Sequence, residues 1–383
     1  MTDSGLVSES AKPAPGCHTV VEAPMPHSPT PLDILLAVLK LPERTGQIAT
    51  QPDLWGEIKS LAEIHRLSGV LASTASASLP PAERPWRDRV LMVHHRRHQL
   101  FLGQLRVLVE AFRAEGIPCV VLKGPLLAER IHPVPFLKFS HDLDLLVRAS
   151  DIPPAARLME RAGFALRGNY PWSVHRGYSH DLEFAGAGDV GTVEVHFALK
   201  AGPRIIAAED FIDRAVPWRS ADGSEFQVLS PADEGFYLIV HAAGHAFHRL
   251  RWLYDALAVL KTLRGPDLAR VRSMALKMRV TGYFVAADLA SLEFFGEGLP
   301  LDLTGFAKPW LWSRLRTDHL RTMAHRENYN ALARTLDVCR MSGTPASALQ
   351  LCLRNGAGKL PALLYRLRGG ATGPEVLART IPD

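Results

Sequence analysis

Residues 137–147 read LKFSHDLDLLV and place two aspartates inside a stretch that is otherwise typical of a buried strand. Side chains alternate between the two faces of a strand, so Asp142 and Asp144 share one face while Leu143 and Leu145 share the other. Two carboxylates side by side on a partly buried surface repel each other and lose hydration. The sequence therefore predicts that a cation meets this pair.

Two flanking motifs favour a metal and a nucleotide at this position. A short apolar run ends in Lys123-Gly124, and a glycine at a strand end lets backbone N–H groups approach a phosphate closely. Lys123 could place a positive charge on a triphosphate. Asp142 and Asp144 offer the hard oxygen ligands that Mg²⁺ prefers, and Glu194 on a neighbouring strand could complete a site for two Mg²⁺ ions. One ion would activate an attacking hydroxyl, and the other would hold the leaving pyrophosphate.

Alternatives remain for several of these residues. An isolated D-x-D is also typical of a solvated strand edge or a loop. VEVH (193–196) places Glu194 and His196 on one strand face, which favours Glu194 as the third carboxylate, although Glu183 in SHDLEF also lies in an alternating stretch. Lys138, four residues before the first aspartate, is a second cation that could reach the phosphates or could be a surface charge.

Patterning along the chain predicts an α+β protein: a small mixed β-sheet core between N-terminal and C-terminal helical regions. Ser230-Pro231 is a typical helix start, with Ser230 as N-cap. The expected organisation is a disordered tail at 1–30, a helical region at 31–116, an α/β core at 117–228, a helical domain at 229–368 and a flexible tail at 369–383.

Composition is that of an ordinary globular protein. The 383 residues carry a net charge of +5, which is compatible with a polyanionic partner without requiring one. The four cysteines form no CxxC pair, so neither a disulfide framework nor a cysteine zinc site is indicated. No run approaches the roughly 20 apolar residues of a membrane span. Residues 1–30 lack the features of a secretory signal, so we expect a cytoplasmic protein without a membrane partner.

A second group of polar residues follows the start of the last helical region. His241, His245 and His248 have the spacing of one helix face, and we expect them either to flank a cleft or to be hydrogen-bonded in a core. A zinc site is a weaker alternative because no H-E-x-x-H glutamate is present. Arg251 and Asp255 are spaced for an ordinary helix ion pair. The basic stretch RVLMVHHRRHQL (89–100) is either a solvated helix face or a contact for a polyanion.

The segment LKGPLLAERIHPVPFLKFSHDLDLLV resembles the signature of the uncharacterised nucleotidyltransferase family of the polymerase-β-like superfamily. VEVHFAL resembles the family's E-[LV]-H-W strand, and SPADEGFYLIVHAAGHAFHRLRWLYDALAVL is similar to its helical segment. The resemblance covers about residues 31–265. It implies Asp142, Asp144 and Glu194 as metal ligands, with Lys123 and Gly124 as the phosphate-facing turn.

Three positions depart from the family pattern. Lys138 stands where arginine is usual, His141 where a small residue is common, and Gly124-Pro125 where the superfamily usually has Gly-Ser.

The resemblance implies a Mg²⁺-dependent enzyme that transfers a nucleoside monophosphate from an NTP such as ATP to a hydroxyl-type acceptor and releases pyrophosphate. Lys123, Gly124, Lys138 and His196 are the expected nucleotide-binding residues. Two alternatives stay open: a toxin-like transferase acting on tRNA, and a non-catalytic domain that binds nucleotide or a partner. The acceptor, whether small molecule, glycan, peptide or RNA, and the oligomeric state have no readable signal in the sequence.

Overall fold

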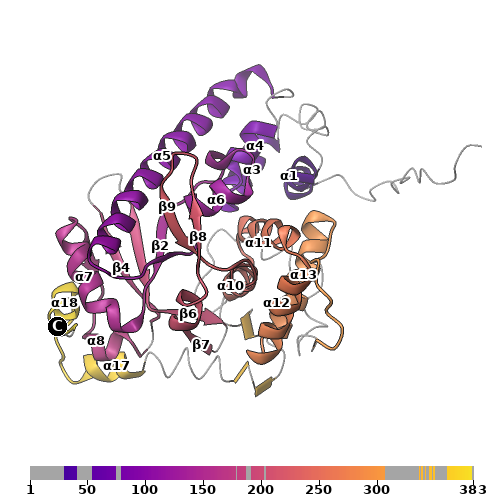
Figure 1. Ribbon diagram of the computed structural model, residues 1–383. Coiled ribbons are helices and arrows are strands. Elements are labelled where there is room, and N and C mark those ends of the chain that lie inside the picture. The colour runs from indigo at the N-terminus through magenta and orange to yellow at the C-terminus, as the bar shows by residue number, and fades with distance from the viewer. Residues whose placement is uncertain are drawn as a thin grey trace, which may run out of the picture.

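The computed structural model describes residues 30–40, 54–74, 79–177, 179–186, 191–201, 204–306 and 360–381, with single positions between 336 and 349. These residues form a seven-stranded mixed sheet with helices on both faces (Figure 1). The predicted α+β class with a mixed sheet is thereby confirmed. The tail expected at 1–30 lies, except for residue 30, outside the described residues.

The order of strands in the sheet is β3-β4-β5-β2-β1-β9-β8, and β6 and β7 form a separate hairpin. Strand β2 lies in the middle, antiparallel to β1 and parallel to β5. The strands are β1 (Val120–Val121), β2 (Asp142–Leu146), β3 (Ala165–Arg167), β4 (Asp181–Ala185), β5 (Thr192–His196), β6 (Ala198–Ala201), β7 (Arg204–Ala207), β8 (Val216–Arg219) and β9 (Glu225–Val228).

Helices precede, interrupt and follow the sheet in the sequence. They are α1 (Pro31–Lys40), α3 (Trp55–Ile64), α4 (Ser68–Thr74), α5 (Arg84–Ala114), α6 (Pro125–Ile131), α7 (Ile152–Arg161), α8 (Trp172–His175), α9 (Glu209–Ile212), α10 (Pro231–Gly244), α11 (Leu250–Thr262), α12 (Gly265–Lys277), α13 (Thr281–Phe295), α17 (Leu360–Leu367) and α18 (Pro374–Thr380). The expected cap of α10 is confirmed, because the Ser230 side chain accepts a hydrogen bond from the Asp233 backbone N–H. No described helix is long and apolar enough to cross a membrane.

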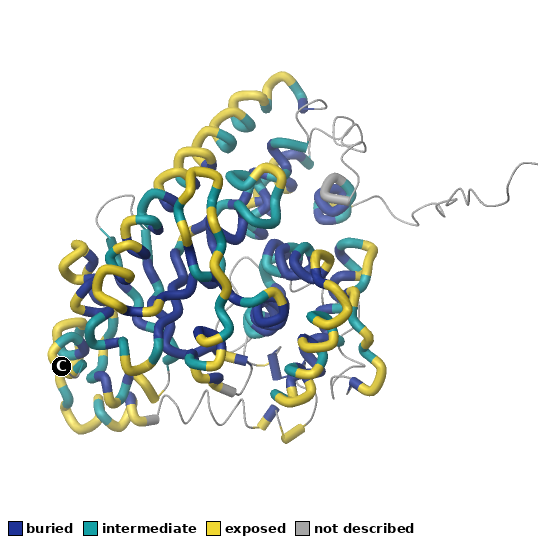
Figure 2. The backbone as a smooth tube through the Cα atoms, viewed as in Figure 1, coloured by how far each residue is buried: buried dark blue, intermediate teal, exposed yellow. Residues whose placement is uncertain are grey.

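The two faces of the sheet contact two different hydrophobic cores, seen as the buried stretches of Figure 2. Leu143 and Leu145 of β2 and Val193 and Val195 of β5 point into one core, which α5 and α7 cover. The opposite face carries the charged residues of β2 and turns toward α10. The alternation of β2 thus separates an apolar face from a polar one, as the sequence predicts.

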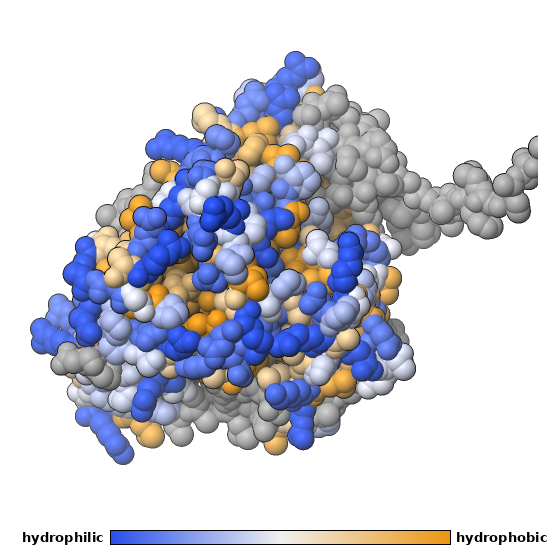
Figure 3. Space-filling view, viewed as in Figure 1, coloured by the Kyte–Doolittle hydropathy of each residue, from blue (hydrophilic) through white to orange (hydrophobic). Residues whose placement is uncertain are grey.

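The helices between residues 31 and 116 are divided between these cores. Helices α1, α3 and α4 pack in the same core as α10–α13, whereas the C-terminal half of α5 packs on the sheet. Because α5 has 31 residues, it extends for about 46 Å and contacts both parts of the molecule. Figure 3 shows that hydrophilic residues cover most of the viewed face, with smaller apolar areas near its middle.

The C-terminal residues differ from the flexible tail expected at 369–383. Helix α18 packs against α8 and β3, and its Leu377 is fully buried. The Trp172 backbone N–H donates a 2.8 Å hydrogen bond to the Thr380 hydroxyl. One buried leucine in a short Gly- and Pro-rich segment gives too little periodicity to predict a helix from the sequence.

Candidate active site

The polar face of the sheet is built by the register between two parallel strands. Asp144 of β2 lies opposite Glu194 of β5, and Leu146 lies opposite His196. With period-two alternation, Asp142 and Asp144 share this face with Glu194 and His196. The structure therefore brings the predicted carboxylates of two distant segments side by side.

Lys123 is the principal cation that meets the two aspartates. Its Nζ atom lies 2.7 Å from Asp144 Oδ2 and 3.7 Å from Asp142 Oδ2. The contact with Asp144 is the shorter of the two, and it gives this buried carboxylate a counter-charge within the protein. Gly124 follows with φ +83°, a left-handed conformation that favours glycine, and leads into α6. The prediction that a cation meets the paired aspartates is thus confirmed.

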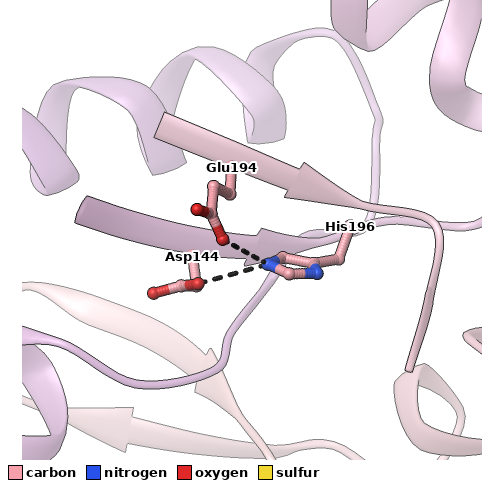
Figure 4. Close-up of side chains that lie close together, drawn as sticks. All are labelled: Asp144, Glu194 and His196. Carbon is pink, nitrogen blue, oxygen red and sulfur yellow. Dashed lines mark hydrogen bonds and ion pairs between the residues drawn. The ribbon is translucent and has the colours of Figure 1, made fainter. Parts of the chain in front are cut away.

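His196 is a second cation at Asp144, and it also contacts Glu194 (Figure 4). Its Nε2 atom lies 3.2 Å from Asp144 Oδ1 and 3.4 Å from Glu194 Oε2. Asp144 is completely buried, so these contacts replace the hydration that its carboxylate has lost. One imidazole therefore holds the acidic groups of two adjacent strands together.

The pKa values show which groups are charged when no ligand is bound. Burial favours the neutral form of Asp144, but Lys123 and His196 outweigh it and lower the pKa of Asp144. Burial likewise opposes the charge on His196, yet hydrogen bonds to Asp144 and Glu194 raise its pKa to about 10. Lys123 also has a raised pKa, because the attraction of Asp142 and Asp144 exceeds its desolvation. Both cations are therefore protonated at neutral pH.

Glu194 is the carboxylate that these two cations do not fully balance. Burial raises its pKa to about 7, and the negative charge of Asp144 adds to the increase. Asp142, Asp144 and Glu194 are three carboxyl groups beside the two cations Lys123 and His196. The donor set thus has room for further positive charge.

A cavity of about 570 Å³ lies in front of this face, with the strand residues on one side and residues of α10 and α11 on the other. His241, His245 and His248 line it, which confirms the expectation that they flank a cleft. They do not share one helix face, because α10 ends at Gly244. Ala246 and Phe247 then adopt positive φ values of 53°, which turn the chain before α11 begins. The spacing of the three histidines in the sequence gives no sign of this left-handed turn.

Lys138 also lines the cavity, but it is not a surface charge. Only 5% of its side chain is exposed, and its Nζ atom lies 2.6 Å from Asp255 Oδ2. His132 and Arg251 contact the same carboxylate at 2.9 and 3.5 Å, so the expected Arg251–Asp255 pair is part of a larger group. Burial lowers the pKa of Lys138 to about 8 despite the attraction of Asp255. The structure thus places Lys138 in a buried ion pair at the cavity wall.

The structure also separates the two candidates for the third carboxylate. Glu183 lies opposite Glu194 in the register of β4 and β5, yet its Oε1 atom pairs with Arg167 Nη1 at 2.8 Å in an exposed position. Glu194 lines the cavity instead. Asp181, at the start of β4, lines it too and was missed by the sequence argument, although its alternation with Glu183 was a usable signal.

Two arginines at the cavity were missed as well. Arg66 follows α3 and Arg249 precedes α11, and both line the same cavity as the carboxylates. Arg66 lies outside the recognised motifs, and Arg249 lies in the stretch that resembles the family's helical segment but has no role assigned there. Both reach the site through long-range packing of the helical regions. A smaller cavity of about 170 Å³ shares Arg66, Lys138, Arg251 and Asp255 with the larger one.

The residues present fit a metal ion. One ligand atom each from Asp144, Glu194 and His196 lies within 4.8 Å of the other two. Asp142 adds a half-exposed carboxylate beside Asp144. Carboxylate oxygens suit Mg²⁺, whereas a ring nitrogen is a less typical ligand for this ion and suits a supporting role.

A mixed sheet with carboxylates on adjacent strands, beside a Lys-Gly turn and a cavity, fits a nucleotidyltransferase. The sequence matches the profile of a family described as uncharacterised nucleotidyltransferase over residues 51–294. This match covers more than half of the chain, so the protein belongs to that family. No curated protein shows significant similarity to the chain. Membership supports a nucleotidyltransferase activity and an NTP substrate.

Proposed function

We propose that the protein transfers a nucleoside monophosphate from an NTP to a hydroxyl-type acceptor in the presence of Mg²⁺ and releases pyrophosphate. The observation that carries this proposal is the position of Asp144 beside Glu194 on parallel strands, with Lys123 2.7 Å from Asp144. The adjoining cavity of about 570 Å³ has the size of a small-molecule site.

Asp142, Asp144 and Glu194 are the residues that would hold Mg²⁺, for which we propose two ions. Bound Mg²⁺ would supply neutralisation of the triphosphate charge and a lower pKa for the acceptor hydroxyl. The unbalanced charge of Glu194 supports this assignment, because an added cation would lower its raised pKa and make it fully anionic.

Lys123 acts as a charge partner for the phosphates in this proposal. Without ligand it neutralises Asp142 and Asp144 from one side. Its position next to Gly124 puts it where phosphate oxygens can approach the backbone. As a point charge rather than a bidentate fork, it would contribute most when negative charge builds on the leaving pyrophosphate.

His196 is a positioning residue. Because one ring nitrogen contacts both Asp144 and Glu194, the imidazole fixes the separation of their carboxylates before any ligand binds. Its charge also offsets part of their repulsion. The carboxylates of Asp144 and Glu194 are therefore held in place before a ligand binds, which lowers the free-energy cost of assembling the site.

Incubation with NTPs labelled on the α-phosphate tests the proposal. The purified chain receives Mg²⁺, each of the four ribonucleotides, and separate acceptor pools of polyhydroxylated small molecules, total RNA and protein. We expect label to enter one pool with equimolar release of pyrophosphate, and an RNA acceptor would identify the tRNA-modifying alternative. No transfer by the wild type to any pool, combined with no binding of Mg-NTP, would contradict the function.

A further inference from the structure

Two arginines of the helical regions face the cavity of the candidate active site. Arg66 and Arg249 line the main cavity together with carboxylates of β2 and β5. Among the described residues, neither arginine has an ion-pair partner. By contrast, Lys123, Lys138 and Arg251 at the same cavity each contact an aspartate.

The contacts of the two guanidinium groups leave them available for a ligand. Arg66 has a buried Nη1 atom with no hydrogen-bond partner among the described residues. Arg249 lies over the ring of Trp252, 5.2 Å from its centroid, which orients the guanidinium without satisfying its N–H groups. Buried N–H donors without acceptors are costly, so a protein retains them where a ligand supplies the acceptors.

The backbone at Arg66 has an unfavourable conformation. Arg66 has φ +61° at the end of α3, where its N–H donates to the Glu63 carbonyl and the Leu67 N–H donates to the Ala62 carbonyl. Glycine is the usual residue at this left-handed position of a helix end. An arginine there indicates a role for its side chain that offsets the strain.

Electrostatics also point to an anionic ligand. Burial lowers the pKa of Arg66 to about 10, and the positive charges of Arg249 and Arg251 lower it further. Asp142 is the carboxylate that acts most strongly on both Arg66 and Arg249. The arginines thus repel one another and are both attracted by the partly exposed Asp142.

We infer that Arg66 and Arg249 form the subsite for the pyrophosphate end of the NTP. This rests on the proposed function and assigns two residues to it. In an in-line displacement the acceptor hydroxyl and the leaving pyrophosphate lie on opposite sides of the reacting phosphorus. The bond from the α-phosphorus to the bridging oxygen breaks as the acceptor oxygen bonds to phosphorus. The acceptor hydroxyl releases its proton to solvent, and the pyrophosphate leaves with the electron pair. Arginines near Asp142 would stabilise that charge, because guanidinium groups bind phosphate oxygens in a bidentate manner.

Calorimetric titration with inorganic pyrophosphate and Mg²⁺ tests the subsite without knowledge of the acceptor. Arg66→Gln and Arg249→Gln should each weaken pyrophosphate binding about tenfold or more, on the scale of one charge-assisted hydrogen bond. Arg66→Lys and Arg249→Lys keep the charge and should lose less. Arg270→Gln on α12 is the matched control, because this exposed arginine carries the same charge and is not among the residues that line the cavity. Its effect should stay below about twofold.

The outcomes separate this inference from the proposed function. If the wild type binds neither pyrophosphate nor Mg-NTP, the nucleotidyltransferase proposal itself fails. If the wild type binds pyrophosphate and both glutamine variants bind it equally well, the arginine subsite is wrong and these residues serve another anion. Thermal unfolding of the ligand-free variants provides a second measurement. Because the arginines repel each other, neither glutamine variant should unfold at a lower temperature than the wild type, and a lower value would indicate a structural role instead.

Discussion

The strand side and the helical side of the cavity differ in how their charges are balanced. On the strand side, Lys123 and His196 compensate Asp144 within the protein. On the helical side, Lys138 is compensated by Asp255, whereas Arg66 and Arg249 have no ion-pair partner in the part of the chain that the structure describes. The strand side is therefore assembled without a ligand and accepts a further cation, whereas the helical side carries positive charge that an anion would satisfy. A metal–triphosphate complex has both properties.

The largest expected effect separates the two aspartates of the motif. Asp144→Asn should lower the rate of transfer by about 10³-fold or more, because it removes a metal ligand and one charge of the pair. It should also destabilise the fold by about 3 kcal/mol, since Lys123 and His196 lose their buried counter-charge. Asp142→Asn should reduce activity similarly without this loss of stability, because Asp142 is half exposed.

Product formation and thermal unfolding of the two variants are the measurements. Equal stability of both variants would mean that the ion pairs of Asp144 with Lys123 and His196 do not contribute measurably to the free energy of unfolding. Full activity of either variant with Mg²⁺ would show that it is not a metal ligand.

Glu194 and Glu183 provide a matched pair within one register position of β4 and β5. Glu194→Gln should lower the rate by about 10²- to 10³-fold through loss of the third carboxylate. Glu183→Gln should leave the rate within about twofold, because Glu183 pairs with Arg167 in an exposed position. Initial rates of the two variants at saturating Mg²⁺ are the measurement. An inactive Glu183→Gln together with an active Glu194→Gln would assign the third carboxylate to β4.

Lys123→Ala should lower kcat by about 10²-fold through loss of one charge-stabilising group. Its second effect concerns the free protein, in which Asp142 and Asp144 lose their shared cation. Mg²⁺ should then raise the unfolding temperature of the variant more than that of the wild type, because the ion replaces the missing positive charge. Melting curves with and without Mg²⁺ test this, with Lys200→Ala as control. An equal response to Mg²⁺ in variant and wild type would place the ion away from these aspartates.

On the helical side, Asp255→Asn should destabilise the protein by about 2 kcal/mol, because the buried Lys138 loses its counter-charge. The loss is limited because Lys138, with a pKa of about 8, can release its proton. Lys138 and His132 hold the pKa of Asp255 below its usual 3.8. In acid the unfolded chain therefore binds more protons, so the wild type gains stability as pH rises through this range and loses it as pH falls below about 4.

Unfolding temperatures between about pH 5 and pH 3 measure this effect, over the interval in which an unfolded aspartate titrates. The difference between wild type and Asp255→Asn should shrink as the pH decreases. A constant difference would show that the charge of Asp255 does not contribute.

The smallest expected effect is in α5, which contacts both sides. Gly103→Ala should stabilise the protein by up to about 1 kcal/mol, because alanine favours a helix interior over glycine. A Cβ atom at this position would have no neighbour within 4 Å. Chemical denaturation measures the change, and Gly191→Ala is the contrast, since its Cβ would lie 2.6 Å from Phe101 and its φ is positive. A lower stability of Gly103→Ala would contradict this expectation, because it would mean that the added methyl group meets a neighbour at this position.

The sequence predicted much of the strand side. Alternation in β2 predicts an apolar and a polar face. The paired aspartates predict a neighbouring cation, and the structure places Lys123 there. The cap at Ser230 was also readable. These features depend on interactions between neighbours in sequence, or on the fixed period of a strand.

The helical side was much less predictable. Arg66 and Arg249 belong to segments distant in sequence and meet only because α3 and α11 pack in one core. The end of α10 at Gly244 depends on two left-handed residues, Ala246 and Phe247, whose types give no such signal. For Lys138 the sequence left a phosphate contact and a surface charge open and did not predict the buried ion pair, because its partner Asp255 is more than a hundred residues away. Long-range packing decides each of these features.

Helix α5 has a mechanical consequence for the cleft. One end packs beside α4, which belongs to one hydrophobic core, and the other lies on the sheet in the second core, so a single continuous helix joins the two cores. Hinge motions need a few residues that can absorb a large change in backbone angles, and the interior of a hydrogen-bonded helix offers none. Opening and closing by rotation of one half against the other should therefore have a small amplitude. Substrates would enter a cleft of nearly constant width, and selection would depend on its shape rather than on closure.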